Sequence, residues 1–450
     1  MSPGSAVFQR IPGRQLTPDD VLHSTCRCPP IHLPGSTQGW TWHCLCRGCR
    51  CHRSGGTRLQ GRPNTGIPWD VIGVIIAVIS CVAAMEVAGG LELLVMLSER
   101  VLRRNPKRIT FLAPTVTFFM TVLCGTGHVA FATLPVIAEV AKEQKVRPSR
   151  PLSIAAVASQ IGICASPISA AMVAMAAIVG PLGVSYPKLV LVSIVGGFAG
   201  SMIGAIVSSK LGCELELDPV YLERLEKGQV LHRGKGSYDI KPYAKRSLVI
   251  FVASLVVVMV YAASITAVDK PPLPRGAAIM TFMMTAALII AALCKVPLKE
   301  ITSQATYKSG TSAAICVMGV AWLGNTFVSS NIATIKTAGS GVIHSAPWLL
   351  FVVLFLAASL LYSQAATTVT FMPVAAALGI PASVLVGCFA AASALFLLPI
   401  YPTVVAAVEM DDTGSTKIGK YIFNHSFLVP GIVSILVACP VSYGVMLLVG

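Results

Sequence analysis

Long apolar runs alternate with short charged loops along most of this chain. About 20 apolar residues are enough for a helix to span a bilayer, and most of the runs reach this length. The pattern therefore predicts an all-α integral membrane protein. The apolar runs are 71–97, 109–123 with 129–140, 152–180, 189–209, 247–267, 277–294, 309–324, 347–362 with 369–379, 382–410 and 421–449.

Two of these runs are interrupted by small polar residues. The first interruption is Leu123–Val129 and the second is Tyr362–Thr368. A Pro-Val pair follows each of them, and Pro135 and Pro373 are separated by 238 residues. In lipid, irregular backbone is tolerated only where it lines a protected polar cavity. Broken hydrophobic segments in corresponding halves of a chain therefore indicate the binding site of a secondary transporter.

Loop charges predict the orientation of the first broken segment. Loops 98–108 and 141–151 carry mainly Lys and Arg, so the positive-inside rule assigns both to the cytoplasm. The segment 109–140 must then leave and return on the same side. Its arms of about 15 and 12 residues rise about 22 and 18 Å, which is less than the roughly 30 Å hydrocarbon core. We therefore predict a re-entrant hairpin with Gly125–His128 at its tip.

The second broken segment, 347–379, is predicted to be a hairpin of the opposite orientation. The stretch before it carries only Lys336 and His344 as basic residues, which favours an external position. Hairpins that enter from opposite faces are typical of an inverted-repeat, ion-transporter-like secondary transporter. The predicted parts are a tail 1–66, a first transport repeat 67–209, a cytoplasmic loop 210–246 and a second transport repeat 247–450.

The tail 1–66 differs in composition from the rest of the chain. It contains eight Arg and six Cys but no Lys and no Glu, and it lacks the apolar region of a signal peptide. The run His43–His52 has metal-ligand residue types, yet zinc sites typically pair two ligand clusters across a folded spacer. We expect a disordered or mis-translated tail and no metal site.

Composition narrows the functional class further. The chain is 54% hydrophobic and 12% charged, with a net charge of +15, whereas soluble domains carry about 25% charged residues. The basic residues beyond the tail lie in loops between apolar runs, so they indicate topology rather than nucleic-acid binding. The sequence shows no motif of a hydrolase, metalloprotease or nucleotide-binding enzyme. We expect a lipid-embedded protein that is not an enzyme and has no cofactor.

A second pair of helices is broken by proline near the middle. Ser166-Pro167 aligns with Tyr401-Pro402 at an offset of 235. Helix N-termini at such breaks offer about +0.5 charge and unpaired N–H groups, which suit a carboxylate. The predicted substrate-binding residues are Gly125, Thr126, Gly127, His128, Ser159, Gln160, Ser166, Ser169, Ser363, Gln364, Thr367, Thr368, Tyr401 and Thr403.

Each of these residues also has a structural interpretation. Ser and Thr in membrane helices usually bond to their own helix or join contacts between helices. Gly125 and Gly127 are also compatible with close helix packing alone. His128, the ionisable group of the first tip, is equally compatible with a proton relay, a ligand contact or a packed neutral histidine.

Several runs of the chain resemble the anaerobic C4-dicarboxylate transporter (Dcu) family, and its A-type members most closely. They extend over about 67–450. The resemblance implies a multi-pass carrier of the bacterial inner membrane that exchanges or takes up fumarate, malate, succinate and aspartate, notably in anaerobic fumarate respiration. The fold type suggests a homodimer. The runs are Leu102–Lys107, Gly125–Gly127, Thr133–Gln144, Ala165–Ser169, Gly319–Leu323, Leu361–Thr367, Leu398–Pro399, Tyr401–Thr403, Met410–Gly414 and Asn424–His425.

The chain departs from the family pattern in two places. Family members begin with two hydrophobic helices, where this chain has the tail 1–66, and they carry an acid where this chain has Asn325. Two alternatives therefore stay open. One is a cation-coupled carrier or antiporter for another ion, and the other is a truncated product without transport function.

Overall fold

The computed structural model describes residues 69–230, 240–265 and 271–304, parts of 306–319, and almost all of 347–449. The predictions for the tail 1–66 and for Asn325, Lys336 and His344 lie outside these residues, as does part of the run 309–324. The described secondary structure is helical, apart from one isolated bridge between Ile418 and His425. The all-α class is confirmed.

The described α-helices vary from short turns to full membrane-length elements. In chain order they are α3 (Trp69–Val87), α4 (Gly90–Arg104), α5 (Ile109–Cys124), α6 (Ala130–Glu143), α7 (Ser149–Ala165), α8 (Ala170–Val179), α9 (Tyr186–Ser209), α10 (Pro219–Glu226), α11 (Ala244–Ser264), α12 (Arg275–Leu293), α13 (Leu298–Ser303), α15 (Leu349–Leu361), α16 (Gln364–Ala377), α17 (Ala382–Cys388), α18 (Pro402–Glu409) and α19 (Leu428–Val449). Short 3-10 turns are η1 (Pro106–Arg108), η2 (Gly127–Val129), η3 (Gly180–Leu182), η4 (Leu215–Leu217) and η6 (Phe389–Ser393).

Several described helices are long and apolar enough to cross a membrane. They are Pro106–Cys124, Tyr186–Ser209, Ala244–Ser264, Arg275–Leu293 and Leu428–Val449. Ser149–Ala165 and Ala170–Leu182 are long and apolar enough only when taken together, and they are bent by 42° at the break between them, as the proline at 167 predicts.

The run 71–97 differs from the single span that its hydropathy predicts. It divides into α3 and α4, which are bent by 75°. Gly89 adopts a left-handed backbone conformation with φ of 88°, which glycine reaches without a Cβ clash. Glu92 and a basic last turn make α4 much more polar than α3. An apolar helix followed, after a sharp bend, by an amphipathic one therefore replaces the single expected span.

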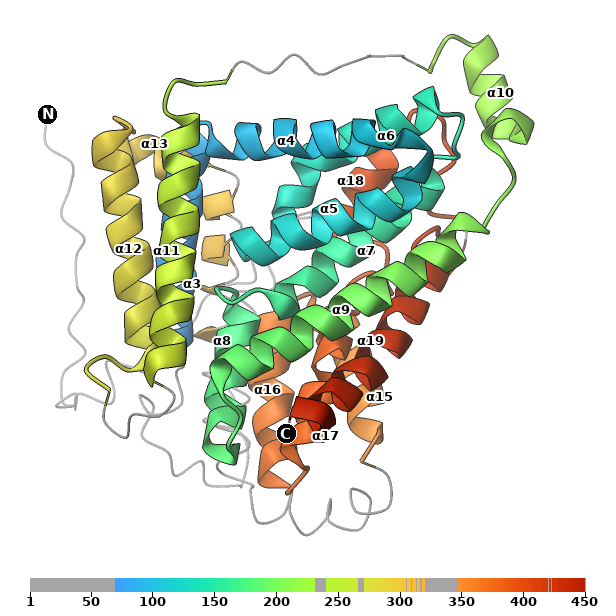
Figure 1. The fold of residues 1–450 in the computed structure, drawn as a ribbon. Helices are drawn as coiled ribbons and strands as arrows, with labels where there is room; N and C mark the ends of the chain where they lie inside the picture. The colour runs from blue at the N-terminus through green and yellow to red at the C-terminus, as the bar shows by residue number, and fades with distance from the viewer. Residues whose placement is uncertain are drawn as a thin grey trace, which may run out of the picture.

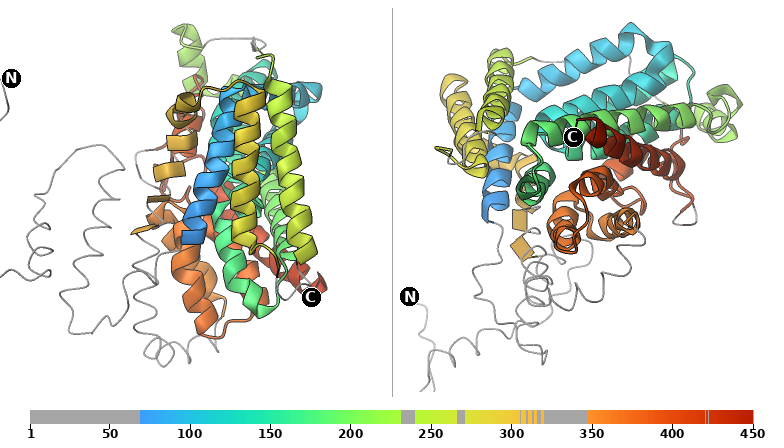
Figure 2. Two further views of the ribbon diagram at one scale, coloured as in Figure 1. Left: turned by 90° about the vertical axis from the view of Figure 1, so that its left-hand side faces the viewer. Right: turned by 60° about the horizontal axis from the view of Figure 1, so that its bottom comes forward.

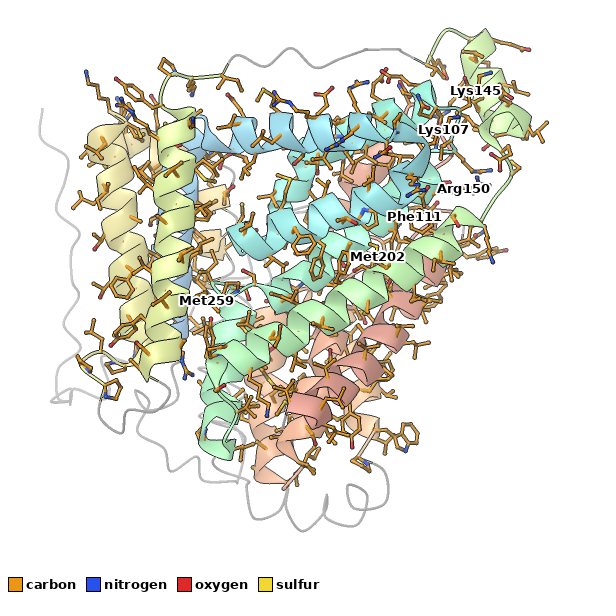
Figure 3. The ribbon with its side chains drawn as sticks, in the orientation of Figure 1. Lys107, Phe111, Lys145, Arg150, Met202 and Met259 are labelled. Carbon is orange, nitrogen blue, oxygen red and sulfur yellow. The ribbon has the colours of Figure 1, made fainter. Side chains whose placement is uncertain are left out.

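Two groups of helices lie side by side. α3, α11 and α12 form one bundle in all views, and α4 leads from its upper end to α6 in the second group (Figures 1 and 2). In the second group α5 packs along α7, and α9 packs along α19. α11 and α12 expose aliphatic side chains such as Val256, Val260 and Leu288. Figure 3 shows side chains that project outward from both helices. Exposed aliphatic faces of this kind suit contact with lipid.

Small residues allow α9 and α19 to approach closely. Gly196, Gly200 and Gly204 of α9 face Ser442, Ala438 and Ser434 of α19. A Cβ added at Gly200 would overlap the carbonyl oxygen of Ser434 and lie 2.8 Å from the Cβ of Ala438. This spacing is the small-residue pattern of membrane helix packing.

We expect Gly200→Ala to destabilise the protein by about 1–3 kcal/mol, the usual cost of overpacking. The added methyl meets backbone, so no change of rotamer relieves the overlap. Thermal unfolding of the detergent-solubilised protein measures the effect. Gly444→Ala is the matched control, because a Cβ there meets nothing within 4 Å. Equal unfolding temperatures for both variants would contradict the interpretation.

Ion pairs close the base of the first broken segment. Arg103 at the end of α4 pairs with Glu143 at the end of α6 at 2.6 Å. Only η1 separates α4 from α5, so the ion pair holds the start of α5 near the end of α6. The first arm is longer than predicted, because η1 and α5 together form the 19-residue helix Pro106–Cys124. The prediction that this hairpin is re-entrant therefore loses its length argument and, like the inverted repeat, stays a prediction.

Candidate functional site

The first broken segment has a defined turn at its tip. α5 ends at Gly125 in a left-handed conformation with φ of 73°, and Thr126 follows in an extended conformation. The Thr126 hydroxyl accepts a hydrogen bond from the His128 amide at 3.3 Å and lies 3.0 Å from the His128 Nδ1. A Cβ at Gly125 would lie 2.9 Å from Ile168. Gly125 is therefore required both by its φ and by its contact with the α7–α8 break.

The second broken segment has the same local design. α15 ends at Tyr362 in a left-handed conformation with φ of 50°, and Ser363 follows in an extended conformation. The Ser363 hydroxyl caps α16 by accepting from the Ala366 amide at 3.2 Å. Like α6, α16 contains an internal proline, at Pro373. Both predicted tips thus consist of a left-handed residue, an extended hydroxyl residue and a proline-containing helix.

The proline-broken helices also have the predicted form. α7 ends at Ser166, and the Ser169 hydroxyl caps α8 by accepting from the Met172 amide at 3.1 Å. The predicted run 382–410 divides into α17, η6, an irregular stretch and α18, whose first residue is Pro402 after the extended Tyr401. The chain therefore starts a new helix within each of the two predicted breaks.

Gln160 joins three of these elements. Its Nε2 donates to the Thr403 hydroxyl of α18 at 3.1 Å, and its backbone carbonyl accepts from Gln364 Nε2 of α16 at 3.2 Å. Gln160 and Thr403 are fully buried and Gln364 is 4% exposed. The Gln160 Oε1 is buried without a hydrogen-bond partner. The structure thus brings together residues of both predicted repeats around one side chain with unused hydrogen-bonding capacity.

Most predicted hydroxyls form local bonds instead. Thr367 and Thr368 donate to carbonyls one turn earlier in their own helix segment, at 2.8 and 2.7 Å. Ser159 donates to the Ala156 carbonyl at 2.7 Å, and Ser166 accepts from the Ile168 amide at 3.4 Å. The first tip meets α7 by packing, since a Cβ at Gly127 would lie 3.4 Å from the Ser159 carbonyl oxygen. These contacts match the structural interpretation of the hydroxyls and leave their role in binding untested.

Sequence reasoning missed other polar groups near the breaks. The hydroxyls of Thr121, Tyr362 and Thr370 are buried without a hydrogen-bond partner. Thr121 lies one turn before Gly125, and its carbonyl accepts from the Gly125 amide at 2.8 Å. Proximity to a break within an apolar run was the available signal for all three.

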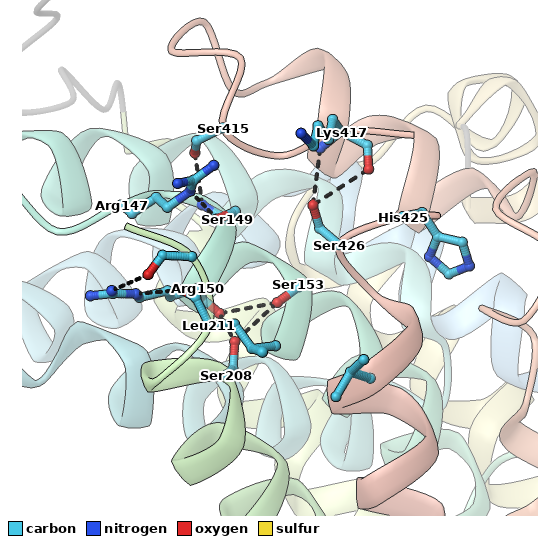
Figure 4. A pocket seen from close by; sticks show the side chains of 12 residues that line it. Arg147, Ser149, Arg150, Ser153, Ser208, Leu211, Ser415, Lys417, His425 and Ser426 are labelled. Atoms are coloured by element: carbon cyan, nitrogen blue, oxygen red, sulfur yellow. Dashed lines mark hydrogen bonds between the residues drawn. The ribbon is translucent and has the colours of Figure 1, made fainter. Parts of the chain in front are cut away.

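A basic pocket lies where the polar ends of α7, α9 and α19 meet (Figure 4). Its volume is about 150 Å³. Arg147 pairs with Asp218 at 2.9 Å, and Arg150 pairs with Glu214 at 3.0 Å and donates to the Leu211 carbonyl at 2.9 Å. Both guanidinium groups thus fasten the loop after α9 to the start of α7. Across the described residues, no cluster of three or more His, Cys, Asp or Glu side chains is suited to hold a metal ion.

The chain matches the family model of the anaerobic C4-dicarboxylate membrane transporter over residues 57–450. It is 53% identical over 373 residues to the C4-dicarboxylate transporter DcuA of Wolinella succinogenes. The aligned residues cover 82% of this chain and 86% of that protein. It is 49% identical over 386 residues to DcuA of Escherichia coli strain K12, and the aligned residues cover 85% of this chain and 89% of that protein.

Neisseria gonorrhoeae MtrF, whose structure was described as illuminating a class of antimetabolite efflux pumps, resembles the chain with a TM-score of 0.54 and 12% identity. The likeness covers 90% of this chain and 93% of MtrF, and at this identity it shows the fold alone. The family match spans all of the apolar runs, and both relatives are of the A type that the motifs indicated. The chain therefore belongs to the anaerobic C4-dicarboxylate membrane transporter family.

Proposed function

We propose that this chain is a secondary transporter that exchanges or takes up C4-dicarboxylates, namely fumarate, malate, succinate and aspartate. Its substrate class follows from the named function of relatives that are 49–53% identical over most of both chains. It is a multi-pass protein of the bacterial inner membrane, in keeping with its family and its apolar helices. The observation that carries the proposed site is the meeting of α7, α16 and α18 at Gln160.

The chemistry of this meeting point suits an anion. α16 and α18 begin at the breaks after Tyr362 and before Pro402, and helix N-termini present unpaired N–H groups and about half a positive charge each. α8 begins at a third break, next to the first tip. A carboxylate at such a terminus replaces water as the partner of these N–H groups. The proposed site includes the fourteen residues that the sequence predicted.

The proposed mechanism is alternating access by two inverted repeats, 67–209 and 247–450. The matching local conformations at Gly125-Thr126 and Tyr362-Ser363 support this repeat. We include a homodimer in the proposal, with the exposed aliphatic faces of α11 and α12 in contact with lipid or a second copy.

Vesicles containing the purified protein and preloaded with succinate test the function. Labelled fumarate should enter faster than it enters protein-free vesicles, because exchange needs no other driving ion. No exchange above that background would contradict the proposal. A flux that follows a sodium or pH gradient without any dicarboxylate would instead support a cation-coupled carrier for another ion.

We expect Ser363→Ala and Thr367→Ala each to weaken exchange with little loss of protein in the membrane. Ser363 caps α16, and loss of a capping hydroxyl costs about 1 kcal/mol, which disturbs the helix terminus that would face the ligand. Initial rates of fumarate uptake measure the effect. Ser359→Ala is the control, because this buried hydroxyl bonds within α15, one turn before the tip. If both tip variants match the control, the second tip is not part of the site.

A further inference from the structure

Arg275 is a half-buried cation without an acidic partner among the described residues. It is the first residue of α12, at the end of the α11–α12 pair that is remote from the charged loops (Figure 1). Its Nε is buried and has no hydrogen-bond acceptor. A buried N–H donor without an acceptor is unfavourable unless an anion or another acceptor binds it in another state of the protein.

The contacts of Arg275 reach the second group of helices. Its Cζ lies 5.0 Å from the centre of the Tyr186 ring, at the start of α9. Its Nη1 lies 3.9 Å from the position of a Cβ at Gly180, which follows α8. A cation over an aromatic ring is attracted by the ring quadrupole. Such a contact uses no hydrogen-bond acceptor, and the Arg275 Nε is still without one.

Tyr186 connects this cation to the candidate site. The Tyr186 side chain is fully buried, and its hydroxyl donates to the carbonyl of Pro167. Pro167 lies in the break between α7 and α8, between the predicted residues Ser166 and Ser169. Arg275 is therefore separated from the break by a single aromatic ring.

We propose that Arg275 binds a carboxylate of the dicarboxylate at the outer side of the α7–α8 break. The inference rests on the proposed transport function and adds a permanent cation, since the fourteen predicted residues include no Lys or Arg. A guanidinium binds a carboxylate through two parallel N–H···O bonds, and Nε with one Nη is a suitable donor pair. Removal of one positive charge weakens binding of a dianion more than binding of an ion with net charge −1.

A purely structural role predicts a different result. Arg275 also lies near the C-terminal end of α8, where a cation stabilises the helix dipole. Loss of that role alone lowers the amount or the maximal rate of the carrier and changes all substrates alike. If Arg275 binds the substrate, its loss raises the KM. The rise is larger for succinate than for aspartate, because the ammonium group of aspartate reduces its net negative charge.

The test compares Arg275→Gln, Arg275→Lys and the control Lys188→Gln in exchange vesicles. Lys188 is a cation two residues after Tyr186 in the same helix. We expect Arg275→Gln to raise the KM for succinate about tenfold with a smaller rise for aspartate, and Arg275→Lys to restore part of the affinity. Lys188→Gln should stay near wild type. Equal changes for both substrates, or equal changes in the control, would overturn the inference.

A measurement on the wild-type protein covers the case in which Arg275→Gln does not fold. Phenylglyoxal modifies accessible guanidinium groups, and mass spectrometry reads each arginine separately. Saturating succinate should slow the modification of Arg275 and leave the modification rate of the exposed Arg246 unchanged. Butyrate, which carries one carboxylate, should protect Arg275 less than succinate does. Unprotected Arg275 would overturn the inference even if exchange occurs. Absence of exchange by the wild type would instead contradict the proposed function itself.

Discussion

Replacement of Lys142 with methionine should remove most of the folded protein from the membrane. The Lys142 ammonium lies 3.0 Å from Glu139 of its own helix and 2.9 Å from Asp412 in the loop after α18. The side chains of Lys142 and Glu139 are only 4% and 7% exposed. Methionine keeps the aliphatic length of lysine but leaves two carboxylates without this cation. Breaking a buried ion pair by removing one partner costs about 3–5 kcal/mol, which is a large share of the stability of most domains.

The control for Lys142 is an exposed ion pair close to it in sequence. Lys145 lies 2.6 Å from Glu216, with both side chains more than half exposed, and such pairs contribute about 0–1 kcal/mol. The unfolding temperature and membrane level of Lys145→Met should therefore stay close to wild type. If Lys142→Met unfolds at the same temperature as Lys145→Met, the buried pairs do not hold α6 to the loop after α18.

The breaks of the helices could be predicted from sequence because their causes are local. Gly125 permits a left-handed residue, and a proline such as Pro167 or Pro402 lacks the amide that would continue the preceding helix. These properties act within a few residues, so a run of residue types is sufficient to find them. The same reasoning identified the residues at the start of α16, although Tyr362 reaches its positive φ without being glycine.

The contacts between distant segments could not be predicted in the same way. Gln160 and Thr403 are 243 residues apart and meet only because α7 and α18 pack together. The pairing of Lys142 with Asp412 and of Arg275 with Tyr186 has the same origin. The bend at Gly89 was missed for another reason, because the apolar run continues through it and hydropathy alone does not distinguish a turn from a span. The helical turn at Pro106–Arg108 was also missed, because its two basic residues placed it in the predicted loop 98–108 rather than in a membrane helix.

We expect Gln160→Leu to reduce C4-dicarboxylate exchange at least about a hundredfold, which corresponds to roughly 2.7 kcal/mol of lost transition-state stabilisation. Leucine is similar in size but removes the donor to Thr403 and the unfilled Oε1. The backbone carbonyl that accepts from Gln364 is kept. The Thr403 hydroxyl then lacks its partner in a buried position, which costs about 1–3 kcal/mol at the point where the three helices meet. Uptake of labelled fumarate at several concentrations separates a change in KM from a change in maximal rate.

The strength of this test lies in the contrast between two glutamines. Gln144 follows α6 outside the candidate site and is only partly buried, so Gln144→Leu should exchange near the wild-type rate. Gln160→Glu, which keeps the shape and adds a negative charge, should also fail, because it repels a dianion in a site with little water. Gln160 is fully buried, so the added carboxylate also lowers the stability of the protein. A structural role of Gln160 alone would lower the unfolding temperature of each variant in proportion to its lost activity. Loss of exchange in both variants that exceeds the loss of folded protein in the membrane is the pattern that a ligand-facing carboxamide requires.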